Sequence, residues 1–178
     1  MLRGVIMRLF QPTMYQKSIF EINYSQLKKL GITCLVFDLD NTLGMIHHKK
    51  CPQQVKELVK ELKKDFLVLI CSNNFKNRIQ PYLEELEVEG ICLSMKPTTI
   101  GLKSILKKYH LKKEEMCLIG DQMLTDILSG NRFHIKTILV DPMGEKDLKI
   151  TNLNRKIENK IIKQYQKKGV FERGKYYE

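Results

Sequence analysis

Residues 34–43 read CLVFDLDNTL, a short apolar run that ends abruptly in two carboxylates. The run Ile32–Phe37 shows no regular polar and apolar alternation, which predicts a strand buried on both faces, as in a parallel sheet. Because side chains alternate along an extended backbone, Asp38 and Asp40 should point to the same side. Two like charges at the end of a strand are costly to keep together unless a cation or a reaction uses them.

Three interpretations of this stretch compete from the residues alone. One is a plain polar turn, because Asp and Asn commonly end strands by bonding their own backbone. An EF-hand calcium loop fails, since its sixth position would be Leu43 instead of Gly and its twelfth Lys49 instead of Glu. The third is a phosphoryl-transfer site, in which one Asp attacks phosphorus and the other handles the proton.

The remainder of the chain alternates strand and helix patterns. Four further apolar runs predict strands at Phe66–Cys71, Gly90–Leu93, Met116–Ile119 and Ile135–Val140. Helical patterns separate them, and Pro81 predicts a kink or a restart within the helix expected at Phe75–Leu86. The alternation predicts an α/β fold, a doubly wound and mostly parallel sheet of about five strands with helices on both faces.

Each of the first four predicted strands ends in a polar cluster. In chain order the clusters are Asp38 with Asp40 and Thr42, Ser72 with Asn73, Lys96, and Asp121 with Asp126. The carboxyl ends of parallel strands share one edge of the sheet, which is where ligands bind in such folds. Four polar clusters at one edge favour the phosphoryl-transfer interpretation over the polar turn.

Length and composition suit one globular domain over residues 1–178, with 43% hydrophobic and 29% charged residues. The five cysteines form no C-x-x-C pair, and four of them lie in apolar runs. They indicate small buried thiols in a reducing cytosol, and therefore a cytoplasmic protein. The apolar stretch Met1–Phe10 is broken by Arg3 and Arg8, so it suits neither a signal peptide nor a spanning helix.

The net charge of +11 is concentrated in the two ends of the chain. Residues 1–31, a basic extension with a short helix before Gly31, carry five basic residues and one acidic residue. Residues 148–178 carry nine basic and three acidic residues, and residues 153–165 place Leu153, Ile157, Ile161 and Tyr165 at helical spacing. Two interpretations of this basic amphipathic helix stay open: binding to an anionic membrane surface, or packing on the sheet with a solvated charged face.

Together these residues resemble a known family. FDLDNTL, Ser72, Lys96-Pro97 and GDQMLTD correspond in order and spacing to the four motifs of the haloacid dehalogenase (HAD) superfamily of phosphatases, over about residues 32–141. The wider pattern, with GIT, CSNN and an NR-x-x-E segment near the C-terminus, is similar to the YqeG-type branch, which is related to mitochondrial phosphatidylglycerophosphate phosphatases.

The resemblance implies a role for each motif residue in a Mg²⁺-dependent phosphomonoester hydrolase. Asp38 would be the nucleophile that forms an aspartyl-phosphate, and Asp40 would protonate the leaving alcohol and then deprotonate water. Asp38, Asp121 and the backbone carbonyl of Asp40 would hold Mg²⁺. The supporting residues would be Thr42 for the turn, Ser72, Asn73 and Lys96 for the phosphate, and Asp126 to orient Lys96 or a metal-bound water.

The loop lengths bear on the substrate. Only about eight residues separate Leu43 from Pro52, and Ser72 to Lys96 holds one helix and one strand, so no cap domain fits. An open site suits a phosphate carried by something large. With the basic ends, this predicts a peripheral enzyme at an anionic membrane, and the resemblance implies phosphatidylglycerophosphate as the substrate. The roles of His47 and His48 stay undetermined.

Two alternatives remain from the sequence. One is a HAD phosphatase for a nucleotide, a phosphoprotein or a nucleic acid end, although the chain has no Trp and no evident row of aromatic residues for base stacking. A nucleic acid is therefore not expected as a partner. The other is a phospho-receiver module. Asp40 and the later pair Asp121 and Asp126 favour an enzyme that turns over its substrate over a receiver that only becomes phosphorylated.

Overall fold

The computed structural model describes residues 8–144 and 149–178, without the side chains of 149–155. Its centre is a six-stranded sheet in the order β1-β6-β5-β2-β3-β4, in which every neighbouring pair is parallel. The strands are β1 Met14–Gln16, β2 Cys34–Phe37, β3 Leu67–Cys71, β4 Glu89–Ile91, β5 Met116–Gly120 and β6 Lys136–Val140.

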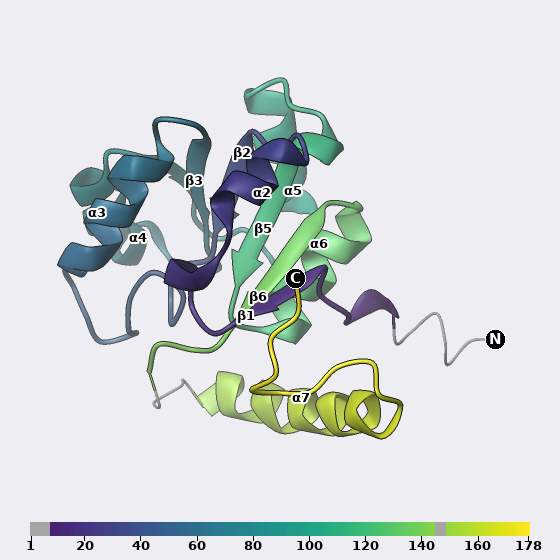
Figure 1. Cartoon of the computed structure of the whole chain (residues 1–178). Helices are drawn as coiled ribbons and strands as arrows, with labels where there is room; N and C mark the ends of the chain where they lie inside the picture. The colour runs from purple at the N-terminus through teal and green to yellow at the C-terminus, as the bar shows by residue number, and fades with distance from the viewer. Residues whose placement is uncertain (1–7, 145–148) are drawn as a thin grey trace.

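Helices cover both faces of the sheet, as the alternation of strand and helix patterns predicts (Figure 1). One face packs against α2 (Tyr24–Lys29), α3 (Gln53–Leu62) and α4 (Lys76–Leu86). The other packs against α5 (Ile100–Lys108), α6 (Leu128–Phe133) and α7 (Lys149–Lys167). Short turns of 3-10 helix, η1 (Ile19–Glu21) and η2 (Lys113–Glu115), and a π-helical turn, η3 (Met123–Ile127), complete the elements. The predicted doubly wound α/β fold is confirmed.

Strand β2 lies between β5 and β3, and all four of its residues are buried. Leu35 and Phe37 enter the core beneath α3 and α4, whereas Cys34 and Val36 enter the core on the α5 side. Burial on both faces explains why this stretch lacks a polar and apolar alternation. Phe37 is level with Ile70 of β3 and Ile119 of β5, so the three strands end side by side.

The sequence patterns miss one strand. Strand β1 adds a sixth, edge position beside β6; three residues are too few for a periodic pattern, and parallel pairing to a distant strand decides its conformation. Pro81 lies inside α4, and the helix does not restart there. Between Phe37 and Lys96 the chain adds only α3, β3, α4 and β4, so no cap domain is inserted.

Helix α7 runs beneath the sheet in Figure 1, and of its predicted inner face Ile161 and Tyr165 pack inward. Ile162 and Tyr165 are buried against Met123 and Leu139, whereas Ile157 is exposed and the side chain of Leu153 lies outside the described residues. Of the two interpretations of this basic helix, the structure has the one in which the helix packs on the sheet, because the apolar side of α7 covers it. No helix among the described residues has the length and apolar character that crossing a bilayer requires.

The chain end beyond α7, whose order the sequence leaves undetermined, returns to the sheet. Phe171 is buried, and Tyr177 exchanges backbone hydrogen bonds of 2.8 and 2.9 Å with Tyr15 of β1. This bridge gives the backbone of the edge strand β1 a partner on its outer side.

Candidate active site

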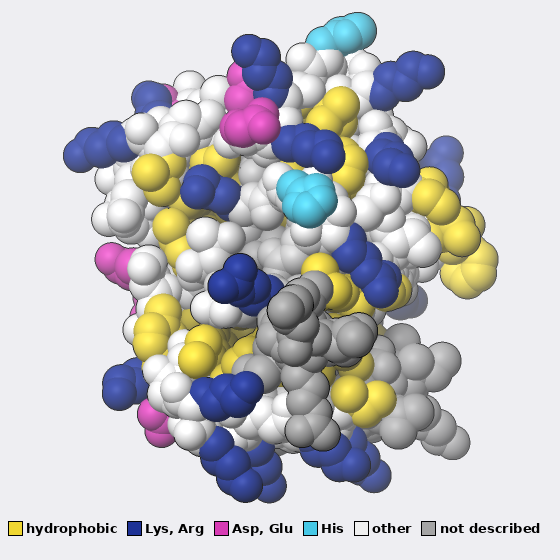
Figure 2. Space-filling view, turned by 90° about the vertical axis from the view of Figure 1, so that its right-hand side faces the viewer, with side chains coloured by type: hydrophobic (Ala, Val, Ile, Leu, Met, Phe, Trp, Pro, Cys, Tyr) yellow, Lys and Arg dark blue, Asp and Glu magenta, His cyan; other side chains and the backbone are white. Residues whose placement is uncertain are grey.

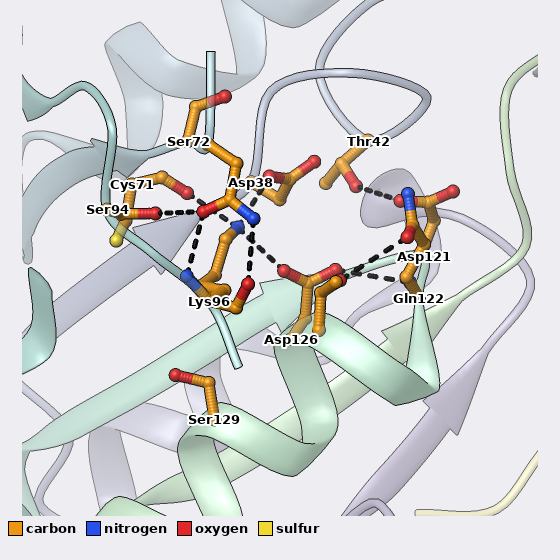
Figure 3. Close-up of polar contacts among 12 residues, drawn as sticks. Asp38, Thr42, Cys71, Ser72, Ser94, Lys96, Asp121, Gln122, Asp126 and Ser129 are labelled. Carbon is orange, nitrogen blue, oxygen red and sulfur yellow. Dashed lines mark hydrogen bonds and ion pairs between the residues drawn. The ribbon is translucent and has the colours of Figure 1, made fainter. Parts of the chain in front are cut away.

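The polar residues predicted from the strand ends meet at the carboxyl edge of the sheet (Figure 3). Asp38 follows β2, Ser72 follows β3 and Asp121 follows β5, so the level ends of these three strands place them side by side. Lys96 reaches the same place from the loop after β4, and Asp126 from η3. All five residues are buried. This is the edge at which ligands bind in doubly wound folds.

The Lys96 ammonium group joins the two ends of this cluster. Its Nζ donates to Asp38 Oδ1 at 2.6 Å, to Asp126 Oδ1 at 2.7 Å and to the backbone oxygen of Cys71 at 2.7 Å. Burial by itself would lower the pKa of Lys96, but the carboxylates of Asp126 and Asp38 outweigh burial and raise it. Lys96 therefore carries its charge throughout the physiological range.

The backbone of η3 and a glycine hold Asp126 in position. Asp126 Oδ2 accepts from the backbone N–H of Gln122 at 3.1 Å, while Oδ1 faces Lys96. The carboxyl group lies directly over Gly120, where a Cβ would come within 2.3 Å of Asp126 Cγ. Only glycine leaves room for this approach.

We expect Gly120→Ala to lower the free energy of unfolding by about 1–3 kcal/mol and to reduce phosphate release, because the added methyl group forces Asp126 away from Lys96. Thermal melting and a phosphate assay measure both effects. The loss should be much smaller in an Asp126→Ala background, where the clashing carboxyl is gone. Equal losses in both backgrounds would show that the glycine acts elsewhere.

Three carboxylates form a group that suits a metal ion. Asp38, Asp121 and Asp126 are all buried, and one oxygen from each lies within 4.8 Å of the others. Lys96 balances one of the three negative charges, which leaves a surplus that a divalent cation would balance. Carboxylate oxygens are the ligands that hard cations such as Mg²⁺ prefer. The residues present therefore fit a divalent metal at this edge.

The environment of Asp38 also supports a divalent metal at this edge. The pKa of Asp38 is raised to about 7, because burial, together with the neighbouring Asp126, outweighs the lowering effect of the Lys96 charge. A cation beside the carboxyl would favour its ionised, nucleophilic form.

Asp40 is held by residues that the sequence reasoning did not single out. Arg78 donates to Asp40 Oδ1 from Nε at 3.1 Å and from Nη2 at 2.6 Å, and Asn74 Nδ2 donates to Oδ2 at 2.9 Å. Arg78 also bonds the backbone oxygens of Met45 and His48 and so ties this loop to α4. No motif marks an arginine one turn into a helix, and only the fold brings Arg78 to Asp40.

Ser72 and Asn73 have different surroundings. The Ser72 hydroxyl is buried and accepts from Asn74 Nδ2 at 2.9 Å. Asn73 Oδ1 accepts from Ser94 Oγ and from the Lys96 backbone N–H, both at 2.8 Å, and its Nδ2 donates to the Lys96 backbone oxygen at 2.9 Å. The Asn73 side chain thus braces the loop that carries Lys96, and the phosphate contact expected of Asn73 stays a prediction.

The turn after Asp40 brings Thr42 toward the site. Asn41 adopts a left-handed conformation with φ of 62°, which Asn tolerates better than most residues. Thr42 is buried, and its Oγ1 lies 3.5 Å from Asp121 Oδ1, so the turn after β2 meets the loop after β5. His47 and His48 are exposed, and His48 contributes only its backbone oxygen to Arg78.

A cluster of buried aspartates around a lysine, at the carboxyl edge of a capless parallel sheet, is the arrangement expected of a phosphohydrolase of the HAD class. A family model described as HAD-hydrolase-like matches residues 94–152. The chain is also 34% identical over 166 residues to a Bacillus subtilis (strain 168) protein named "Probable phosphatase YqeG", and the alignment covers 93% of this chain and 96% of that protein. The chain therefore belongs to the YqeG family of HAD-superfamily phosphatases, which confirms the resemblance and excludes the receiver alternative.

Two further comparisons are more distant. Phosphatidylglycerophosphate phosphatase 1, chloroplastic/mitochondrial, of Arabidopsis thaliana is 22% identical over 170 residues, which cover 89% of this chain and 49% of that protein. A solved structure of the cobalt-bound deoxy-D-mannose-octulosonate 8-phosphate phosphatase of Haemophilus influenzae superposes with a TM-score of 0.50 at 15% identity, over 81% of this chain and 95% of that chain. At this identity the superposition shows the shared fold.

Proposed function

We propose that this phosphatase hydrolyses phosphatidylglycerophosphate to phosphatidylglycerol through an aspartyl-phosphate on Asp38. The observation that carries the chemistry is the Asp38 carboxylate, which lies at the end of β2 within hydrogen-bond distance of Lys96. Asp38 attacks phosphorus, and the alcohol leaves with a proton from Asp40. Asp40 then takes a proton from the water that hydrolyses the intermediate. Lys96 balances charge on the transferring phosphoryl group, and the buried Ser72 hydroxyl binds one of its oxygens.

Arg78 must change partner during this cycle. Both oxygens of Asp40 are occupied in the structure, one by Arg78 and one by Asn74. An acid needs a proton on one of them, so we propose that substrate binding draws Arg78 away from Asp40. Asn73 then serves as a positioning residue for the Lys96 loop.

We propose Mg²⁺ as the cofactor, held by Asp38, Asp121 and the backbone carbonyl of Asp40. Both oxygens of Asp126 already accept hydrogen bonds, from Lys96 and from the Gln122 backbone, which supports the orienting role expected of Asp126. When bound, the ion supplies positive charge that stabilises the phosphoryl group as it is transferred.

Two features support a lipid substrate with a second negative charge. The Arabidopsis relative is named for phosphatidylglycerophosphate, whose glycerol carries a terminal phosphate beyond the diester phosphate. A hollow of about 390 Å³ lies beside Asp40 and is lined by Lys49, Asn77, Arg78 and Pro81. Lys49 and Arg78, the two cations in its wall, suit the diester phosphate. If Arg78 turned toward this phosphate, it would release Asp40.

We further propose a cytoplasmic enzyme that binds peripherally to an anionic membrane. Lys and Arg side chains are spread over the face drawn in Figure 2, where Asp and Glu are few. Basic residues near an anionic bilayer each contribute about 1 kcal/mol to binding. The basic residues on this face, and the net charge of +11, thus support attraction to lipid.

The test is phosphate release from phosphatidylglycerophosphate in mixed micelles with Mg²⁺, beside a nucleotide and a phosphopeptide as competing substrates. The lipid should be preferred. Lys49→Ala should raise KM for the lipid by about two- to fivefold, the usual worth of a partly exposed ion pair. It should leave turnover of p-nitrophenyl phosphate, which has no second charge, unchanged.

Lys50→Ala is the matched control, because Lys50 is exposed in the same loop but does not line the hollow. If both variants raise KM alike, the effect is one of general charge and the hollow is not the diester site. Preference for the nucleotide or the phosphopeptide would replace the lipid assignment and leave the HAD chemistry in place.

A further inference from the structure

The most exposed large hydrophobic side chains of the described residues gather beside the active site. Phe75 is 70% exposed, Met95 56%, Ile100 51% and Leu93 50%, and every other exposed large hydrophobic side chain is below these values. All four follow β3 or β4, on the segments that supply Ser72 and Lys96. We call these four residues the apolar rim.

Backbone hydrogen bonds join the segments of the apolar rim. The Leu93 N–H donates to the Asn74 oxygen at 3.0 Å, which places Leu93 next to Phe75. The Ser94 N–H donates to the Ser72 oxygen at 3.0 Å, and the Gly101 N–H to the Ser94 oxygen at 3.3 Å. The segments that carry the apolar rim therefore adjoin one another at the edge of the site.

The loop after β4 presents its apolar side chains outward at a conformational cost. Leu93 and Met95 have φ of 48° and 59°, a region that bulky L-residues rarely adopt. Along this loop the side chains alternate: Met95 points to solvent while Lys96 is buried in the site. The same backbone arrangement that directs Lys96 inward thus holds Met95 outward.

The two segments that carry the apolar rim contain basic residues but no acidic ones. Residues 72–80 and 90–113 contain no Asp or Glu. Lys76 and Lys103 are exposed beside Phe75 and Ile100, and Arg132 Nη1 donates to the Pro97 oxygen at 3.2 Å. The acidic side chains nearest to the rim do not add negative charge to its surface, because Asp38, Asp121 and Asp126 are buried in the site and Asp40 is paired with Arg78.

We infer that the apolar rim is the surface by which the enzyme docks on an anionic lipid bilayer. Protruding apolar side chains ringed by Lys and Arg are the composition of a surface that enters the boundary between headgroups and acyl chains. This inference rests on the proposed lipid substrate and specifies how the enzyme reaches that substrate. Docking at the rim brings Lys96 and Asp38 to a headgroup phosphate while the lipid stays in the bilayer. Helix α7 is not the inserting element, because its apolar side already covers the sheet.

The experiment is co-sedimentation of the full chain with vesicles of phosphatidylcholine and phosphatidylglycerol in equal parts. Phe75→Ser/Leu93→Ser removes two rim side chains, and Phe20→Ser/Leu30→Ser removes the same two residue types from exposed positions near α2. We expect the rim variant to bind vesicles about tenfold more weakly, since partial burial of a phenyl and a leucyl side chain is worth at least that factor. The control variant should bind as wild type, and both should hydrolyse p-nitrophenyl phosphate normally.

A second readout does not depend on removing side chains. The chain contains no Trp, so Phe75→Trp introduces a single tryptophan into the rim. Its fluorescence should shift to the blue when these vesicles are added, because the indole enters an apolar environment, whereas that of Phe20→Trp should not. An unshifted Phe75→Trp on bound vesicles would overturn the inference even if the serine variant failed to fold.

Other outcomes separate docking from the substrate. Equal loss of vesicle binding in the rim and control variants, or no binding by wild type, would overturn the docking surface. So would rim-dependent binding to a nucleic acid with none to vesicles. An enzyme that binds vesicles through the rim but releases no phosphate from phosphatidylglycerophosphate supports docking and refutes the proposed substrate.

Discussion

Asp38→Asn should reduce phosphate release by about 10⁴-fold or more, because an amide cannot form the acyl-phosphate intermediate and losing a catalytic nucleophile removes effects of this size. The assay is phosphate release with Mg²⁺, from both the lipid and p-nitrophenyl phosphate. The loss should appear equally with the two substrates, since the nucleophile serves each of them.

The fold should survive this substitution. Asn is close in shape to Asp, and Lys96 keeps Asp126 and the Cys71 carbonyl as partners. Circular dichroism should therefore match wild type. An Asp38→Asn enzyme that is folded and still turns over substrate at a tenth of the normal rate would refute Asp38 as nucleophile.

Lys96→Met should be the most damaging single change to stability, lowering the free energy of unfolding by about 3–5 kcal/mol at neutral pH. Removing one partner of a buried ion pair leaves the other charge uncompensated, and here two carboxylates lose their shared cation. Urea denaturation without added metal measures the effect. Phosphate release should fall as well, because the transferring group loses a positive charge.

The pH dependence of that loss tests its cause. Burial raises the pKa of Asp38 to about 7 in the intact site, and removing Lys96 raises it further, so Asp38 protonates as the pH falls. A protonated carboxyl no longer needs the cation, and the deficit should therefore shrink from pH 8 to pH 5. Lys107→Met, a change at an exposed position of α5, should cost little at any pH. A pH-independent deficit would indicate lost packing instead of lost charge balance.

Most of the site residues can be predicted from the sequence, because they lie next to the ends of predicted strands. Asp38, Ser72 and Asp121 each follow a buried run directly, and parallel strands deliver whatever follows them to one edge. Lys96 and Asp126 lie a few residues beyond a strand, at spacings that the family motifs preserve. Chain order and strand periodicity therefore suffice to bring these five residues together in a prediction.

Other parts of the site depend on contacts between distant segments. Arg78 reaches Asp40 across 38 residues. The bonds of Asn73 to the Lys96 loop exist only because β3 and β4 are neighbours. Neither residue type nor spacing signals such pairings, since a single arginine on a helix and an asparagine after a strand are ordinary surface residues.

The sequence by itself determined the order of the elements, the class of the fold and which polar residues meet at the carboxyl edge of the sheet. Each of these depends on local periodicity and on residues next to strand ends. Tertiary structure alone decided the edge strand β1, the partner of α7 and the apolar rim. A three-residue strand forms only where a neighbour pairs with it, and an amphipathic helix binds whichever apolar surface lies within its reach. Which apolar side chains are covered, as on α7, and which stay exposed, as in the rim, is decided only when the chain has folded.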